Sequence, residues 1–141
     1  MRKPPVKPAN NLVLDSSAVL AWILKEPGGE RVNVLLAQVA AGKAFCAAIS
    51  SVNWCEVLTR LFRDNSSMTA QELDALLAGV ELVPLGRVEA EMAAEYSRFY
   101  PELSLGDRVC LALAYTRKAT AWTTDKIWAR AKVGVPIEIL R

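Results

Sequence analysis

The alternation of short apolar runs with longer amphipathic stretches is the feature that most limits the folds open to this chain. The first run, residues 12–14, has the character of a strand buried on both faces and is followed at once by a helical apolar pattern. Further strand-like runs cover 44–49, 81–85, 119–123 and 136–140. Stretches with helical periodicity separate them, which predicts parallel strands. We therefore expect an α/β fold, a three-layer doubly wound parallel sheet of about five strands flanked by helices.

The domain boundary is predicted near the N-terminus. Residues 1–10 are basic and proline-rich without an apolar segment, so we expect a disordered lead rather than a secretory signal. Residues 11–141 are then one domain, since 141 residues are a usual size for a single core. No apolar run approaches the roughly 18 residues that span a membrane, so no membrane partner is expected.

Composition excludes several kinds of chemistry. The chain has no histidine, which removes Ser-His-Asp triads, Cys-His pairs and histidine-ligated zinc. A net charge of +2 is too small to indicate nucleic-acid binding by itself. Cys46, Cys55 and Cys110 lie in apolar segments without C-x-x-C spacing, so we expect core thiols in a reducing cytoplasm.

Four acidic residues occupy positions that a buried α/β core does not require. Asp15 follows the first strand, and Asp125 follows the fourth. Glu56 lies in helix 52–63, which is apolar around most of its girth and expected to be well buried, and Asp107 lies at the start of a helix. The carboxyl ends of parallel strands share one edge of the sheet, so the sequence predicts that the four carboxylates gather there.

Each acid also has an ordinary structural explanation. Asp15 and Asp125 can be N-caps. Glu56 can pair with Arg60 at i, i+4 on a solvated face. The remaining acid, three residues after Ser104, fits a capping box. These explanations do not account for the recurrence of acids after successive strands, which favours a common site.

Clustered carboxylates repel one another unless a cation joins them, and all-oxygen ligands suit Mg²⁺ or Mn²⁺. Such an ion can activate water and neutralise a phosphate, which predicts metal-dependent phosphodiester hydrolysis. The polar residues that could orient the ligands are Ser16, Ser17, Asn53, Ser104 and Thr123. The candidates for binding RNA phosphates are Arg60, Arg108, Lys126 and Arg130, each of which can also be an ordinary surface charge.

Four motifs in order resemble those of PIN-domain nucleases, and most closely VapC-type toxins of type II toxin-antitoxin systems. They are Val13-Leu-Asp-Ser-Ser17, Ile49-Ser-Ser-Val-Asn-Trp-Cys-Glu-Val57, Leu105-Gly-Asp-Arg-Val-Cys-Leu-Ala-Leu-Ala114 and Thr123-Thr-Asp125. The resemblance implies a Mg²⁺- or Mn²⁺-dependent endoribonuclease, usually a homodimer, neutralised by a VapB-like antitoxin. It assigns catalysis and metal binding to Asp15, Glu56, Asp107 and Asp125, supported by Ser16 and Thr123. Many relatives carry another acid soon afterwards, where this chain has Trp128 and Ala129.

Other functions stay open at this point. A phosphatase or phosphotransferase could use Asp15 as nucleophile, although Ser17 stands where such enzymes of the haloacid-dehalogenase type carry a second Asp. A non-catalytic RNA- or protein-binding module is another possibility, but gathered negative charge would not help RNA binding. For the antitoxin, the resemblance predicts a groove between helices 30–41 and 52–63.

Overall fold

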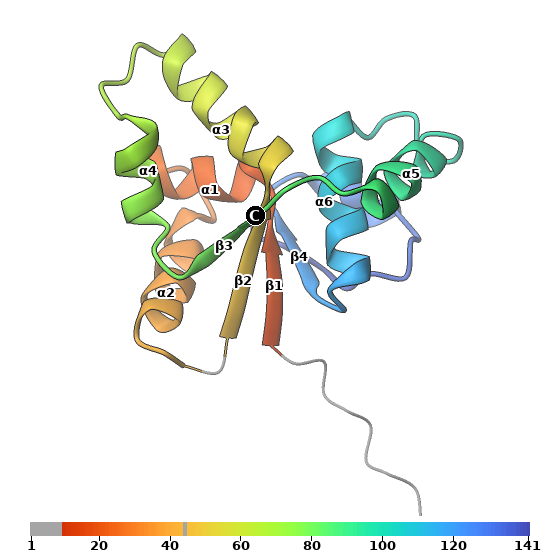
Figure 1. Ribbon diagram of the computed structural model, residues 1–141, viewed down its shortest axis with the longest axis horizontal. Coiled ribbons are helices and arrows are strands. Elements are labelled where there is room, and N and C mark those ends of the chain that lie inside the picture. Colours follow the sequence, from red (N-terminus) through yellow and green to blue (C-terminus); the bar gives the residue numbers. More distant parts are fainter. Residues whose placement is uncertain (1–9, 44) are drawn as a thin grey trace, which may run out of the picture.

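A sheet of five parallel strands lies at the centre of the part of the chain that the structure, a computed structural model, describes: residues 10–43 and 45–141 (Figure 1). The strands are β1 (Asn10–Leu14), β2 (Phe45–Ser50), β3 (Val80–Val83), β4 (Thr120–Thr123) and β5 (Ile137–Ile139). Their order is β3-β2-β1-β4-β5, and every neighbouring pair is parallel. The predicted fold class is confirmed.

The sheet is doubly wound about β1. From β1 the chain moves outward through β2 to β3, and then returns to the other side of β1 for β4 and β5. The strand order therefore reverses between β1 and β4, and ligands of open α/β sheets bind beyond the carboxyl ends of the strands at such a point. Asp15 and Asp125 follow these two strands.

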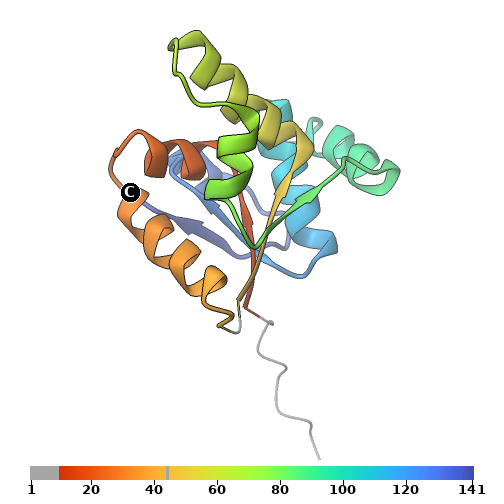
Figure 2. The same cartoon turned by 60° about the vertical axis from the view of Figure 1, so that its left-hand side comes forward.

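Helices cover both faces of the sheet (Figures 1 and 2). They are α1 (Ser16–Ile23), α2 (Gly29–Ala40), α3 (Ser51–Arg63), α4 (Ala70–Leu76), α5 (Arg87–Tyr96), α6 (Leu105–Thr116) and the 3₁₀ helix η1 (Lys126–Arg130). The four helices α1, α2, α3 and α4 pack on one face of the sheet, where they form a core cluster with Leu12, Leu14 and Ile49 of the strands. The opposite face, with Val13 and Ala48, packs against α6. No helix among the described residues is long and apolar enough to cross a membrane.

Several boundaries differ slightly from the expectation. Asn10 already belongs to β1, whereas the rest of the expected lead and Ala44 of the expected second strand lie outside the described residues. The strand expected at 81–85 is β3, which begins one residue earlier and ends two residues earlier. The short helix expected after β4 is the 3₁₀ helix η1, whose buried Trp128 fixes it to the core.

The expected burial of α3 is wrong. Only Asn53, Val57 and Leu61 of this helix are buried, while the side chain of Phe62 is 57% exposed. The helix extends beyond the sheet, so one face alone finds packing partners (Figure 2). Cys55 is consequently exposed, as is Cys46 on β2, and only Cys110 is the core thiol expected.

The expected groove between α2 and α3 stays a prediction, because these two helices are not packed directly against each other over a large area in the described chain. The two do not form a major contact with each other, whereas α1 packs against both. In both views α4 lies between the yellow α3 and the orange α2 (Figures 1 and 2). A partner that bridges α2 and α3 would therefore also contact α1 or α4.

Candidate active site at the carboxyl edge of the sheet

Asp15 occupies the deepest position at this edge. Its side chain is 2% exposed and accepts the N–H of Ala18 at 2.8 Å, so it caps α1 as the structural explanation predicts. The hydroxyls of Ser17 and Thr123 each donate to it at 2.7 Å. Burial nevertheless raises the pKa of Asp15 to about 6, because these hydrogen bonds only partly replace lost hydration. A cap alone does not require a buried charge.

Glu56 is held from two sides. Asn53 is buried and donates from Nδ2 to Glu56 Oε1 at 2.9 Å and to the Gly106 carbonyl at 3.1 Å. Ser16, at the start of α1, donates to the same carboxylate oxygen at 3.1 Å. The alternative pair with Arg60 is not formed, since Arg60 binds Asp64 at 2.9 Å instead. Glu56 therefore faces the other acids rather than a solvated salt bridge.

Gly106 is a site residue that the sequence analysis missed. A Cβ atom at this position would collide with both carboxylate oxygens of Glu56. Glycine thus lets the start of α6 approach that carboxylate closely. The signal available in the sequence was a glycine inside a helix, where it costs up to about 1 kcal/mol relative to alanine and needs a packing or functional reason.

Asp107 completes a capping box at the start of α6. The Ser104 hydroxyl accepts the Asp107 N–H at 3.2 Å, and Asp107 Oδ2 accepts the Ser104 N–H at 3.0 Å. Burial raises the pKa of Asp107 despite these hydrogen bonds. The nearby charges of Asp125 and Glu56 add to the rise. The capping prediction is confirmed, and it places this carboxylate within the electrostatic reach of the other acids.

Asp125 is the most exposed of the four acids. Its side chain accepts the Ile127 N–H at 3.0 Å and caps η1. Its own N–H donates to Thr123 Oγ1 at 3.0 Å, and Thr123 in turn donates to Asp15. One buried threonine therefore ties the ends of β1 and β4 together.

The charges of three acids act on a common neighbour. Burial raises the pKa of the Cys110 thiol well above its usual value, and the charges of Asp15, Asp107 and Glu56 add to the effect. In residues 10–43 and 45–141, however, no three acidic side chains converge closely enough to ligate one ion. Each carboxylate is turned toward its own hydrogen-bond donors, so binding an ion requires some of them to rotate.

The donor set fits a hard divalent cation. Every candidate ligand is a carboxylate oxygen, the ligand type that such ions prefer, and burial raises the pKa of both Asp15 and Asp107. Seating Mg²⁺ or Mn²⁺ would favour the ionised forms. The neighbouring hydroxyls and the Asn53 amide can then orient the ligands.

The four basic candidates are not equivalent in the structure. Lys126 and Arg130 are exposed on η1, next to Asp125. Arg60 is half-exposed on α3. Arg108 instead turns toward α5, where Nη1 donates to the Ala93 carbonyl at 2.9 Å and Nε is buried without a hydrogen-bond partner in the described chain. Arg108 is therefore not placed to contact a phosphate at the acidic edge.

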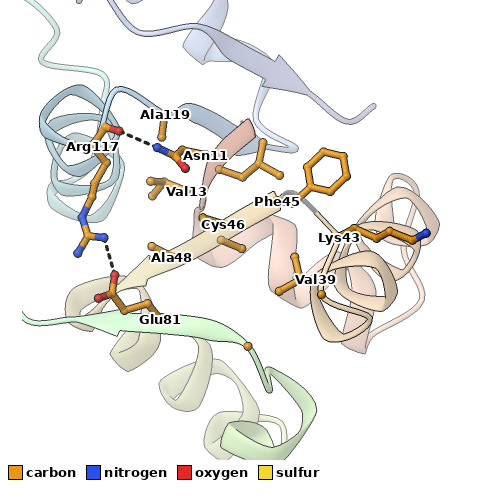
Figure 3. Close-up of a pocket in the computed structure, with 14 residues that line it drawn as sticks. Asn11, Val13, Val39, Lys43, Phe45, Cys46, Ala48, Glu81, Arg117 and Ala119 are labelled. Carbon is orange, nitrogen blue, oxygen red and sulfur yellow. Dashed lines mark hydrogen bonds and ion pairs between the residues drawn. The ribbon is translucent and has the colours of Figure 1, made fainter. Parts of the chain in front are cut away.

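A second hollow lies at the amino end of the strands, away from the four acids. It has a volume of about 520 Å³ and is lined by residues of β1 and β2 with Glu81 and Arg117 at its rim (Figure 3). These two form an ion pair at 2.5 Å, and Asn11 donates to the Arg117 carbonyl at 3.3 Å. Its one acid among the described residues, Glu81, is compensated by Arg117, so the hollow lacks the clustered acids that indicate chemistry at the other edge.

The fold and the acidic edge define a PIN domain. The family model for the PIN domain matches residues 12–134, and the chain belongs to this family. Proteins of this family related to VapC toxins are generally ribonucleases. No protein with curated annotation is similar enough in sequence to be matched.

Solved structures of toxin-antitoxin proteins share the fold. VapBC2 from Rickettsia felis, bound to a DNA fragment from its promoter, is 18% identical with a TM-score of 0.70, covering 93% of this chain and 99% of that chain. A toxin-antitoxin complex from Klebsiella pneumoniae is 16% identical with a TM-score of 0.67 (92% and 98% covered). Mycobacterium tuberculosis VapC20, a toxin that cleaves the sarcin-ricin loop, is 18% identical with a TM-score of 0.67 (86% and 95% covered).

Proposed function

We propose that this chain is a Mg²⁺- or Mn²⁺-dependent endoribonuclease that hydrolyses RNA phosphodiester bonds at the carboxyl edge of its sheet. The observation that carries the proposal is the buried Asp15, within electrostatic reach of Asp107, which in turn is within reach of Glu56 and Asp125; none of these acids has a Lys or Arg ion-pair partner among the described residues. Keeping a buried carboxylate near other acids costs stability, which a fold tolerates where function requires it. Membership of the PIN family supports a nuclease.

In this proposal the side chains of the domain bind the metal ion, orient its ligands and hold the RNA. Asp15, Glu56, Asp107 and Asp125 would hold the ion, which when bound supplies charge neutralisation at the phosphate and acidifies a water molecule. Ser17 and Thr123 would fix the orientation of Asp15, and Asn53 and Ser16 that of Glu56. Lys126 and Arg130, exposed beside Asp125, would hold phosphates of the RNA.

The phosphatase alternative is less well supported. A nucleophilic carboxylate must reach the phosphorus atom, but Asp15 is 2% exposed and both of its oxygens accept hydrogen bonds. A non-catalytic binding module would not need the acidic edge, whose buried carboxylate lowers the stability of the fold. Hydrolysis of RNA is therefore the better supported of these functions.

The toxin role rests on the structural neighbours. The Klebsiella pneumoniae and Rickettsia felis structures are toxin-antitoxin complexes, which supports a VapB-like antitoxin as the partner here. We also propose a homodimer acting in the cytoplasm, with residues 11–141 as the nuclease domain. Expression of the chain alone should arrest growth, and co-expression of the cognate antitoxin should restore it.

Cleavage of total RNA by the purified full chain tests the activity. Wild type should produce discrete cuts with Mg²⁺ or Mn²⁺, and none with EDTA. Asp107→Asn removes one ligand charge and should abolish the cuts. Glu81→Gln neutralises an acid at the opposite end of the sheet and is the matched control. Cleavage that survives EDTA, or that Asp107→Asn retains, would place the activity elsewhere.

A further inference from the structure

Two of the four acids, Asp107 and Asp125, lie on separate segments at the acidic edge. Burial raises the pKa of Asp107 and the charge of Asp125 adds to the rise, so the two carboxylates are within electrostatic reach of each other. Each capping interaction stays within its own helix, since Asp107 binds Ser104 and Asp125 binds the N–H of Ile127. The caps therefore orient the two carboxylates but do not fix the separation between them.

One hydrogen bond joins the two segments that carry these acids. The backbone N–H of Lys132, shortly after η1, donates at 2.9 Å to the hydroxyl of Tyr100, which lies on the connection from α5 to α6. In residues 10–43 and 45–141, no other hydrogen bond links the segment 97–108 with the segment 124–133. The contact therefore ties the chain before Asp107 to the chain after Asp125.

Apolar side chains pack around the same contact. Leu103 and Trp128 are both buried in the core cluster on the α6 face of the sheet, and Tyr100 packs against that cluster. The indole Nε1 of Trp128 has no hydrogen-bond partner in the described chain, so apolar packing holds the middle of η1. Apolar packing is non-directional, whereas a hydrogen bond has a preferred distance and angle. The Tyr100 hydroxyl is thus the directional restraint on η1 from the side of α6.

The other restraint on η1 comes from the side of β1. Thr123 Oγ1 accepts the Asp125 N–H at 3.0 Å and donates to Asp15, which fixes the start of η1 against the end of β1. The helix itself is a 3₁₀ helix, whose hydrogen bonds have poorer geometry than those of an α-helix. Its position relative to α6 therefore depends on what holds its far end, where Lys132 binds Tyr100.

We propose that Tyr100 is a positioning residue that sets the separation between Asp107 and Asp125 for a divalent cation. Tyr100 does not contact the ion, but its hydroxyl holds the segment after Asp125 against the connection that leads into the capping box of Asp107. Partners that support metal ligands typically change metal affinity by about 10- to 100-fold, and Tyr100 acts through the backbone, so we expect the lower end of this range. The inference rests on the proposed nuclease function and adds a residue to its metal site.

Two variants remove the hydrogen bond from opposite sides. Tyr100→Phe deletes the hydroxyl that accepts it, and Lys132→Pro deletes the N–H that donates it. Proline requires an extended residue before it, and Ala131 is extended, with φ of −78° and ψ of 114°. Tyr115→Phe is the matched control, because Tyr115 is 53% exposed near the far end of α6 and its hydroxyl binds no described residue.

Isothermal titration calorimetry of the full chain with Mn²⁺ measures the affinity without any cleavage. Wild type and Tyr115→Phe should bind equally, whereas Tyr100→Phe and Lys132→Pro should each raise the dissociation constant about tenfold. The double variant should bind no more weakly than either single variant, because both remove the same hydrogen bond. Wild-type affinity in Tyr100→Phe, or additive losses in the double variant, would overturn the proposal.

Cleavage kinetics separate positioning from a purely structural role. If Tyr100 only stabilised the fold, its loss would lower the cleavage rate at every Mn²⁺ concentration. Positioning predicts instead that the Mn²⁺ concentration for half-maximal cleavage rises about tenfold in Tyr100→Phe, while the rate at saturating Mn²⁺ stays within about twofold of wild type. A lower saturating rate with an unchanged half-maximal concentration would overturn the proposal.

The role of Tyr100 and the nuclease function fail separately. Metal-dependent cleavage of RNA with equal Mn²⁺ affinity in wild type and both variants would leave the nuclease and remove the role of Tyr100. Weaker Mn²⁺ binding in both variants, without cleavage of RNA by wild type, would remove the nuclease and leave Tyr100 as a determinant of a cation site. Absence of Mn²⁺ binding to wild type would overturn both.

Discussion

The two ends of the parallel strands differ in the burial and pairing of their charged side chains. At the amino end, Glu81 and Arg117 form an ion pair with side chains 57% and 42% exposed, so that each charge is compensated and hydrated (Figure 3). At the carboxyl end, Asp15 is buried, and the pKa of both Asp15 and Asp107 is raised. A buried charge without an ion-pair partner is costly, so the position of Asp15 supports the proposal that a cation and an anionic substrate bind at the carboxyl edge.

The largest effect on cleavage is expected from substituting a glycine at the carboxyl end of the sheet, in contrast to a glycine at its amino end. Gly106→Ala should lower the cleavage rate about 10- to 100-fold, the range for disturbed support of a metal site, because the new Cβ displaces the Glu56 carboxylate. The flexible end of Glu56 can move, and alanine favours the helix, so the free energy of unfolding should change by less than about 1 kcal/mol. Cleavage kinetics and urea unfolding measure the two quantities.

Gly42→Ala is the opposite case. Gly42 has φ of +71° and open space around its Cα, so alanine there costs about 1 kcal/mol of stability through backbone strain. The cleavage rate should not change. A Gly42→Ala variant with impaired cleavage, or a fully active Gly106→Ala variant, would break the contrast between the two ends.

Asp15→Asn should stabilise the protein in the absence of metal. At neutral pH the native state must keep a buried carboxylate ionised, and the substitution removes that charge while retaining an acceptor for the Ala18 N–H. We expect a gain of about 1–2 kcal/mol, less than the full shift in pKa implies because the amide makes poorer hydrogen bonds. Urea unfolding at pH 7.5 in EDTA measures it, and lower stability would contradict this account.

The same group gives wild type a characteristic pH dependence. Between about pH 4 and 6 the native state retains a proton on Asp15 that the unfolded chain has already lost, so stability should fall as pH rises through this window. Above about pH 6 this contribution is constant. Asp15→Asn should show a flatter profile over the same range, and parallel profiles for the two proteins would show that Asp15 is not the group responsible.

The smallest effect is expected for Glu81→Gln. An exposed ion pair contributes less than about 1 kcal/mol, so the substitution should alter the free energy of unfolding only slightly and leave cleavage unchanged. Thermal unfolding and RNA cleavage test both statements. A large loss of cleavage would show that the amino end also takes part in function.

The fold was predictable because its signals are local. Apolar runs, helical periodicity and the capping box at Ser104 and Asp107 each depend on residues close in sequence. The positions of Asp15 and Asp125 at the ends of β1 and β4 also followed from parallel topology. The roles assigned to these acids remain predictions until variants are tested.

What escaped prediction depends on tertiary contacts. Gly106 meets Glu56 only because α6 packs against α3, a contact between segments about 50 residues apart. Arg108 lies next to Asp107 in sequence, yet the helix directs its side chain toward α5. The apolar content of α3 exceeds its burial, because this helix extends past the sheet and only one of its faces finds packing partners.

Metal-dependent stability tests the central claim most directly. Unfolding by urea is measured for wild type, Asp107→Asn and Glu81→Gln, in EDTA and with Mn²⁺ or Mg²⁺. At an ion concentration one hundred times the dissociation constant, wild type and Glu81→Gln should each gain about 2.7 kcal/mol, and Asp107→Asn should gain far less. No gain in wild type, or an equal gain in Asp107→Asn, would show that the acidic edge is not built to hold a cation.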